Sequence, residues 1–222
     1  MIWCDKIQFS YPGEAFDLKI DSLEVSNGET VAVVGPSGCG KTTLLNLISG
    51  NLLPQSGRIE VADVAVPELR MHERQQFRIR RIGLIPQSFD LLEYLTVREN
   101  IMLPYRVSGA LKMDGGVQER CEALAERTGI LNYLDKFPRH LSTGERQRVA
   151  VCRGLINNPE LILADEPTGN LDPENQDLIV SLILEEAARI GATVMMITHE
   201  RSLCSRFERT VDVLAIREEA AE

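Results

Sequence analysis

The stretch from residue 35 to residue 43 carries the residue types that bind the phosphates of a nucleotide. It reads Gly35-Pro36-Ser37-Gly38-Cys39-Gly40-Lys41-Thr42-Thr43 and matches the spacing G-x-x-x-x-G-K-[ST] of a phosphate-binding loop. Glycines allow the backbone to approach phosphates closely. Lys41 can reach the β- and γ-phosphates, and the hydroxyl of Thr42 can ligate Mg²⁺. We therefore predict that the chain binds a nucleoside triphosphate at this loop.

Polar side chains suited to phosphate chemistry follow three other apolar stretches. Asp165 and Glu166 come directly after residues 161–164, where one carboxylate can hold Mg²⁺ and the other can polarise an attacking water. His199 follows a second stretch and can donate a hydrogen bond to the γ-phosphate. Gln87 follows a third, and its amide can contact both Mg²⁺ and water. The structural alternatives are a solvated turn for the two acids and a purely structural histidine.

A compact serine/glycine turn occupies residues 141–148, which read Leu-Ser-Thr-Gly-Glu-Arg-Gln-Arg. It opens a helix that we expect over 149–155. A helix start of this kind is a second place where backbone N–H groups can bind an anion. It lies about a hundred positions from the phosphate loop, so the residues alone leave open whether both turns face the same nucleotide.

Apolar runs before these polar residues predict the strands that position them. Buried strands are expected over 30–34, 82–85, 161–164, 193–197 and 211–216. One helix is expected at 43–49, and another begins at Asp172-Pro173, an N-cap followed by proline at the first helical position. Strands that alternate with helices predict a mainly parallel sheet with its ligand at the carboxyl ends of the strands. Helical patterns and few strand signals predict a helical insertion after residue 88.

Composition narrows the class of protein. The 222 residues are 44% hydrophobic and 26% charged, which is ordinary for a globular protein, and no apolar run approaches the length of a membrane span. The net charge of −9 argues against nucleic acid as the main partner. Five cysteines form no C-x-x-C pair, and the start lacks the apolar core of a secretory signal. We expect a cytoplasmic protein with reduced core thiols.

Together these motifs resemble the ATP-binding subunit of ATP-binding cassette (ABC) transporters over nearly the whole chain. The phosphate loop, Gln87, the 141–148 signature turn, Asp165-Glu166, Asn170-Leu171-Asp172 and His199 occur in that family's order and spacing. The implied fold is α/β: a P-loop NTPase with a mainly parallel sheet, an N-terminal antiparallel β subdomain and an inserted helical subdomain. We expect one domain over 1–222, with a nucleotide-binding core at 1–88 and 159–222 and the helical subdomain, which carries the signature, at 89–158.

The resemblance implies a site shared by two copies of the chain. They would pair head to tail as a homodimer, with each ATP–Mg²⁺ between Lys41 of one copy and Ser142 and Gly144 of the other. Asp172 would link the two sites. Tyr11 would stack on adenine, although a simple turn aromatic is the structural alternative.

Roles for the remaining polar residues follow from the same resemblance. Glu166 would be the general base and His199 the γ-phosphate clamp. The catalytic residues implied in this way are Glu166, His199, Gln87 and Lys41, and the implied metal ligands are Thr42, Gln87 and Asp165.

A subgroup and a partner are also suggested. Residues 91–104 and 167–172 look like those of the lipoprotein-releasing, macrolide-export and cell-division ATPases. Such subunits work with a separate integral membrane permease, so we expect a protein held peripherally on the inner face of the plasma membrane, with no nucleic acid partner. A chromosome-maintenance ATPase and a non-hydrolysing ATP-dependent switch are the alternatives; the first predicts a coiled coil or zinc insertion that this sequence lacks.

The signature departs from the family's L-S-G-G-Q at two positions. Thr143 replaces the first of the two glycines, and Glu145 replaces the glutamine. The stiffer β-branched residue and the new carboxylate near a phosphate site predict slower closure or turnover than is typical.

Overall fold

One of the two β-sheets is antiparallel and is built mainly from the N-terminal quarter of the chain. The protein is represented by a computed structural model that describes residues 1–13 and 16–217. The strand order in this sheet is β2-β1-β4-β5, and its pairs are antiparallel. The strands are β1 (Ile2–Ser10), β2 (Asp17–Val25), β4 (Ser56–Val61) and β5 (Val64–Ala65). The expected N-terminal antiparallel part is confirmed.

The second sheet is entirely parallel, with strand order β6-β7-β8-β3-β9. Its strands are β3 (Thr30–Val34), β6 (Ile82–Ile85), β7 (Leu161–Asp165), β8 (Thr193–Ile197) and β9 (Arg209–Asp212). The strand predicted over 211–216 is wrong in its extent. It starts earlier, and the chain turns after Asp212, whose carbonyl and carboxylate accept the N–H groups of Ala215 and Leu214.

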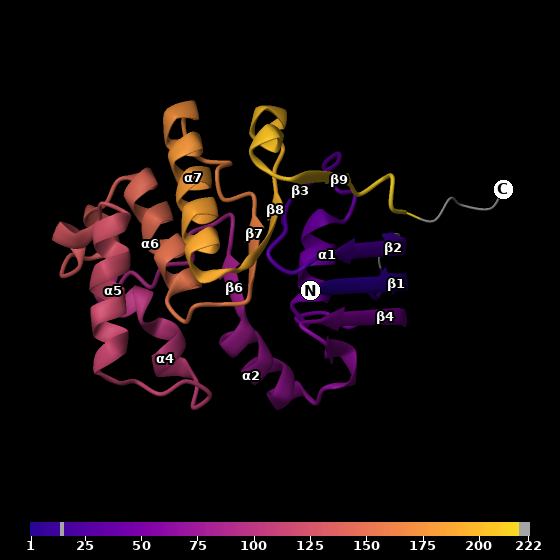
Figure 1. The fold of residues 1–222 in the computed structure, drawn as a ribbon, viewed down its shortest axis with the longest axis horizontal. Helices are drawn as coiled ribbons and strands as arrows, with labels where there is room; N and C mark the ends of the chain where they lie inside the picture. The colour runs from indigo at the N-terminus through magenta and orange to yellow at the C-terminus, as the bar shows by residue number, and fades with distance from the viewer. Residues whose placement is uncertain (14–15, 218–222) are drawn as a thin grey trace.

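Helices cover the parallel sheet and fill the region of the chain between β6 and β7. The helices are α1 (Lys41–Ile48), α2 (Met71–Arg81), α3 (Val97–Ile101), α4 (Leu103–Val107), α5 (Gly115–Arg127), α6 (Thr143–Leu155) and α7 (Pro173–Ile190). Short 3₁₀ helices are η1 (Val66–Glu68), η2 (Leu131–Tyr133), η3 (Pro138–His140) and η4 (Arg201–Arg206). Residues 89–158 contain helices and turns alone. In Figure 1 α4, α5 and α6 lie at one end of the molecule, the antiparallel sheet lies at the other, and the parallel sheet stands between them.

The parallel sheet is buried on both faces, which explains why its strands are continuously apolar. Ile162 and Met196 point into one core cluster, which also holds the buried side chains of α3, α5, α6 and α7. Their neighbours Leu163 and Met195 point into the other, which is shared with α1 and the antiparallel sheet. Side chains that alternate along each strand therefore join the two ends of the molecule through one sheet.

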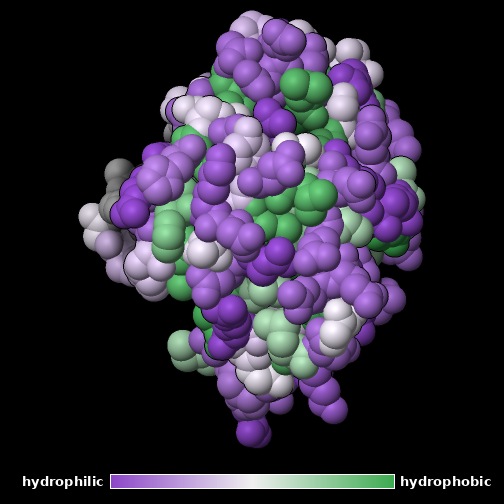
Figure 2. All heavy atoms as spheres, turned by 90° about the vertical axis from the view of Figure 1, so that its left-hand side faces the viewer, coloured by the Kyte–Doolittle hydropathy of each residue, from purple (hydrophilic) through white to green (hydrophobic). Residues whose placement is uncertain are grey.

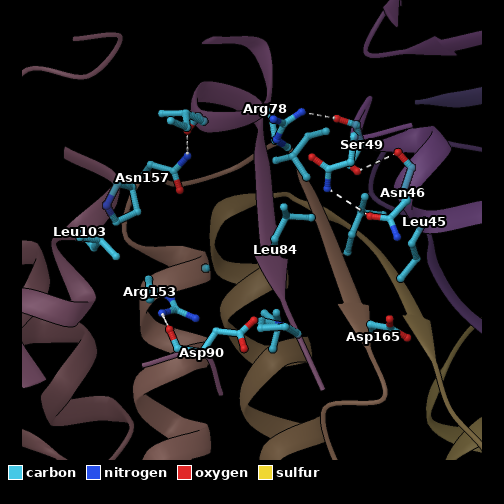
Figure 3. Close-up of a pocket in the computed structure, with 18 of the residues that line it drawn as sticks. Leu45, Asn46, Ser49, Arg78, Leu84, Asp90, Leu103, Arg153, Asn157 and Asp165 are labelled. Carbon is cyan, nitrogen blue, oxygen red and sulfur yellow. Dashed lines mark hydrogen bonds between the residues drawn. The ribbon is translucent and has the colours of Figure 1, made fainter. Parts of the chain in front are cut away.

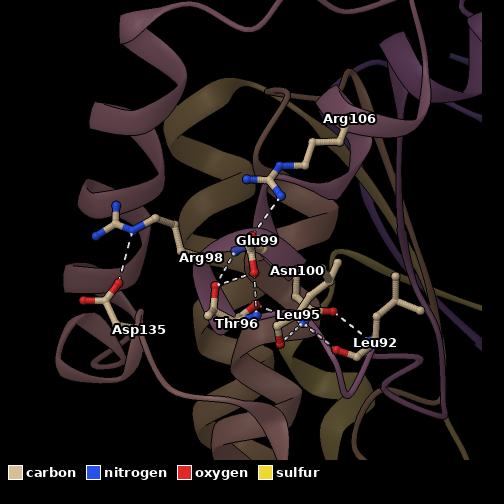
Figure 4. Close-up of polar contacts among 8 residues, drawn as sticks. All are labelled: Leu92, Leu95, Thr96, Arg98, Glu99, Asn100, Arg106 and Asp135. Atoms are coloured by element: carbon tan, nitrogen blue, oxygen red, sulfur yellow. Dashed lines mark hydrogen bonds and ion pairs between the residues drawn. The ribbon is translucent and has the colours of Figure 1, made fainter.

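Asn100 fixes the loop that leads from β6 into the helical region. Its side chain is fully buried; its oxygen accepts the N–H of Leu92, and its amide donates to the carbonyls of Leu92, Leu95 and Thr96 (Figure 4). Thr96 caps α3, and Glu99 completes the capping box. A buried amide with every polar group bonded holds its surroundings rigidly.

The helix predicted at Asp172-Pro173 is confirmed as α7. The carboxylate of Asp172 accepts the N–H of Asn175, and Gly191 ends the helix in the left-handed conformation with φ 70°. Ile179 and Ile183 of its apolar stripe are buried.

The cysteines match the expectation of reduced thiols that lie mostly in the core. All five cysteines are free thiols, four of them are buried, and burial raises the pKa of Cys4 to about 12. Within residues 1–13 and 16–217 no helix combines the length and the apolar character needed to cross a bilayer.

Candidate nucleotide-binding site

The phosphate loop joins strand β3 to helix α1 and closes around Lys41. This lysine is the first residue of α1 and is buried, and its ammonium group donates to the carbonyls of Gly35 and Pro36, both at 3.0 Å. Gly40 caps the helix with φ 102°, and a Cβ there would lie 2.8 Å from Leu18 Cδ1. Only glycine fits this position, and the loop presents its N–H groups at the positive end of a helix dipole.

Thr42, in the first turn of α1, lies beside Asp165, the last residue of β7. The hydroxyl of Thr42 donates to Oδ1 of Asp165 at 3.3 Å. Burial is the largest influence on the Asp165 carboxyl and raises its pKa, while the Thr42 hydroxyl and the Lys41 charge act in the opposite direction. A hydroxyl and a partly buried carboxylate beside a phosphate loop form a donor set that suits Mg²⁺. These residues fit the metal predicted from the sequence.

Glu166 is held by residues from two other strand ends. Its Oε1 is paired with Nε2 of His199, and its Oε2 accepts Nε2 of Gln87 at 3.1 Å. The backbone of Glu166 has φ 45°, in the left-handed region that residues other than glycine avoid. Conformations of this kind cost about 1–3 kcal/mol and cluster at active sites. The structure thus brings together three of the predicted catalytic residues.

Tyr11 lies next to the phosphate loop and is packed against other aromatic rings. Its hydroxyl is 3.3 Å from Oγ1 of Thr43, a buried residue of α1. Phe9 meets it edge to face at 4.9 Å, and Phe16 lies at 5.7 Å. A Cβ on Gly40 would lie 3.1 Å from Phe16, so Phe16 also borders the loop. The sequence contains no signal for Phe16, because it lies outside the motifs and meets Tyr11 only through packing.

The signature turn stands apart from this cluster. Ser142 caps α6 and is exposed, and Gly144 is buried beside the start of α7, where a Cβ would lie 3.1 Å from Oδ1 of Asn175. Among the residues that the structure describes, no hydrogen bond or ion pair joins Ser142 or Gly144 to the phosphate loop. Asp172, the predicted link between two sites, is also exposed, and its carboxylate is bonded to Asn175.

Tyr133 is a second residue that sequence reasoning missed. The carboxylate of Glu145 in the signature lies close to its hydroxyl and raises the pKa of Tyr133. The tyrosine lies in η2, twelve positions before Glu145. No spacing rule connects a 3₁₀ turn with a following helix start, so the sequence offered no signal for the pair.

Comparison with known proteins identifies the family. The family profile described as "ABC transporter" matches residues 18–169. An uncharacterised ABC transporter ATP-binding protein of Mycobacterium tuberculosis (strain ATCC 25618 / H37Rv) is 41% identical over 192 residues, which are 86% of this chain and 77% of that protein. The chain belongs to the ABC transporter family. It is an ABC-type ATPase, built on the P-loop fold described above.

Other relatives and structures agree with this assignment. The lipoprotein-releasing system ATP-binding protein LolD of Saccharophagus degradans (strain 2-40) is 39% identical over 184 residues, which are 83% of this ABC ATPase and 80% of LolD. The macrolide export ATP-binding/permease protein MacB of Syntrophobacter fumaroxidans is 39% identical over 86% of the chain and 27% of MacB. The dimeric structure of a post-hydrolysis state of the ATP-binding cassette MJ0796, bound to ADP and Pi, superposes with a TM-score of 0.82 at 31% identity, over 96% of this chain and 94% of that one.

Proposed function

We propose that this ABC ATPase is the ATP-binding and hydrolysing subunit of a transporter, and that two copies close head to tail on two ATP–Mg²⁺. The observation that carries the proposal is the meeting of Lys41, Thr42, Asp165 and Glu166 at the carboxyl edge of one parallel sheet, with Gln87 and His199 bonded to Glu166. The dimeric structure of the relative MJ0796, which superposes with a TM-score of 0.85, supports the pairing.

Each residue of the cluster has a role that its position supports. Lys41 and the loop N–H groups bind the β- and γ-phosphates of the substrate ATP, and Tyr11 stacks on its adenine. Thr42, Asp165 and Gln87 would hold Mg²⁺, which neutralises phosphate charge when bound. Glu166 orients the attacking water and takes its proton as general base.

His199 and Gln87 control where the Glu166 carboxylate points. Both side chains are exposed, whereas that of Glu166 is 17% exposed. Arrival of a γ-phosphate offers His199 a second acceptor, so it can move from Glu166 to the phosphate and leave the carboxylate free for water.

The exposed signature turn supports a site shared between copies. Ser142 opens a 13-residue helix, so its hydroxyl and the N–H groups beside it can receive an anion from outside the chain. Because Ser142 and Gly144 lie apart from the chain's own phosphate loop, their nucleotide is the one bound to the partner. Asp172, at the neighbouring start of α7, would lie at the same junction.

A groove next to the metal-binding pair supports docking of a membrane permease. It has a volume of about 520 Å³ and runs between α2 and the helical region, with Leu84 of β6 at its centre (Figure 3). Leu103, Pro104 and Val107 of α4 form one wall, and Thr42 and Asp165 reach its end. An apolar groove of this size accommodates a short helix of a partner.

The groove contains charged side chains although its lining is mainly apolar. Arg78 and Arg153 line it and donate to the main-chain carbonyls of Ser49, Asp90 and Phe89. The carboxylate of Asp90, which also lines the groove, acts on Arg153 through its charge. Within the described residues, Arg78 has no such carboxylate among its influences, so it is the groove cation that a partner could neutralise. A permease segment with acidic residues beside apolar ones would match this lining.

We further propose the two-part organisation of the chain that is expected from the sequence. Residues 1–88 and 159–222 form the nucleotide-binding core, and residues 89–158 form the helical subdomain that carries the signature. The chain would lie on the inner face of the plasma membrane, held there by its permease. LolD and MacB among its relatives support a role in lipoprotein release or macrolide export.

The proposed function is tested by light scattering and phosphate release on the native chain and on Glu166→Gln. The variant should form a dimer that appears only with Mg-ATP, and its phosphate release should fall by about 10²–10⁴-fold, because a general base contributes that much. Lys41→Ala is the control; it should stay monomeric because it loses the phosphate contacts. A Glu166→Gln variant that remains monomeric and releases phosphate at the native rate would remove both the base assignment and the shared site.

A further inference from the structure

Glu145, one of the two unusual residues of the signature, holds Ser142 through several bonds. Its Oε2 accepts the N–H of Ser142 at 2.7 Å and the Oγ–H of Ser142 at 2.9 Å. Tyr133 of η2 lies close to the same carboxylate. Partial burial works against ionisation of Glu145, but the bonds from Ser142, the hydroxyl of Tyr133 and the charge of Arg148 lower its pKa overall, so the group is a carboxylate at neutral pH.

Glu145 and a nucleotide phosphate would compete for the single hydrogen of the Ser142 hydroxyl. A serine hydroxyl has one hydrogen to donate, and here Ser142 donates it to Glu145. The oxygens of an ionised γ-phosphate only accept, so Ser142 can bind the phosphate through its hydroxyl only after it leaves Glu145. The carboxylate also brings a negative charge to the place where the phosphate must arrive, and like charges repel there.

We propose that Glu145 is a positioning residue that opposes closure of the two copies on ATP, because it withholds the Ser142 hydroxyl from the γ-phosphate bound to the partner. The inference rests on the proposed function, which places that phosphate at Ser142.

A helix cap is the competing explanation, since Ser142 and Glu145 form a capping box. The two roles respond differently to substitution. Glutamine at position 145 preserves the capping bonds and removes the charge, and alanine removes both. A residue that only caps the helix would leave ATP binding unchanged in the first variant and weaken it in the second.

The experiment measures the Mg-ATP concentration at which half of the chain is dimeric, by light scattering, in the Glu166→Gln background. Adding Glu145→Gln should lower this concentration by about five- to tenfold, because the bond from Ser142 is then to a neutral oxygen and therefore weaker, and the repulsion between carboxylate and phosphate is removed. Glu145→Ala should lower it as well. The difference from the parent should shrink as KCl is raised, because salt screens charge. Glu185→Gln, which changes an exposed glutamate of α7, is the matched control and should leave the midpoint unchanged.

The outcomes separate this inference from the proposed function. If the Glu166→Gln parent dimerises with ATP but Glu145→Gln has the same midpoint at every salt concentration, Glu145 is only a cap and the inference is overturned. If no variant dimerises, the shared site itself fails, and the inference fails with it.

Discussion

Gly83 marks the closest approach between the parallel sheet and the helical region. A Cβ at this position would lie 2.3 Å from the carbonyl oxygen of Gly154 in α6 and 2.8 Å from Cγ of Pro159. Gly83→Ala should therefore lower the free energy of unfolding by about 3 kcal/mol, at the upper end of the range for overpacking, because a main-chain carbonyl cannot yield as a side chain can. Urea unfolding monitored by circular dichroism measures the change.

The matched control is Gly109→Ala. No heavy atom lies within 4 Å of a Cβ built there, and Gly109 does not have a positive φ, so we expect a change close to zero. Equal stability of the two variants would show that α6 and β6 separate without cost.

Among the secondary-structure elements, α5 and α7 are joined by a buried carboxylate. Glu186 of α7 is bonded to Arg127 of α5 and to Arg189 of its own helix, and the Glu186 side chain is only 7% exposed. Burial raises the pKa of Glu186, but the hydrogen bonds and charges of the two arginines lower it further, so the net direction is down. Its ionised form therefore stabilises the contact between the helical region and the core.

This contact predicts a pH dependence of stability. A folded-state pKa below the ordinary value contributes stability that is complete above the glutamate pKa of about 4.3 and is lost as the pH falls through the folded value. Glu186→Gln should cost about 1–3 kcal/mol at neutral pH, less than a fully buried pair because both arginines reach water. Unfolding measured between neutral and acidic pH should then show a shallower decline than in the native chain. Glu185→Gln, an exposed neighbour, should retain the native decline.

The individual elements also show what the sequence could and could not predict. The strands and the nucleotide-binding residues at the phosphate loop were predictable, because continuous apolar runs and fixed motif spacing reflect local rules. The contacts of Tyr133 with Glu145 and of Phe16 with Tyr11 join segments with no shared period, so they emerge only from packing. The left-handed backbone conformation of Glu166 could not be predicted from the sequence either, since glutamate rarely adopts it. The end of β9 was missed because an apolar run through Ile216 concealed the turn after Asp212.

For the molecule as a whole, the proposed docking of a permease in the groove can be tested by substitution. Val107 lines it and is 66% exposed. Val107→Glu should reduce the share of the chain that sediments with the membranes of its native cells by about tenfold, since a charge buried in an apolar contact costs more than 1.4 kcal/mol. ATP affinity of the purified variant should stay native, because Val107 is not among the residues proposed to bind the nucleotide.

Leu214→Glu serves as the comparison, because Leu214 is 50% exposed and lies outside the groove. It should sediment like the native chain. Equal sedimentation of both variants would show that the permease contacts another face.

The side of the molecule that carries α5 and α6 is mostly hydrophilic, with separate apolar clusters (Figure 2).

The groove ends at Thr42 and Asp165, so its occupant shares a wall with the proposed metal-binding pair. This continuity sets a thermodynamic condition on the transporter. If a docked permease segment tightens ATP–Mg²⁺ binding by some factor, then ATP–Mg²⁺ must tighten the segment by the same factor, because coupling between two equilibria is reciprocal. Measuring either affinity with and without the other ligand therefore gives both, and the work that ATP–Mg²⁺ binding can transmit to a docked segment is bounded by the free energy of this coupling.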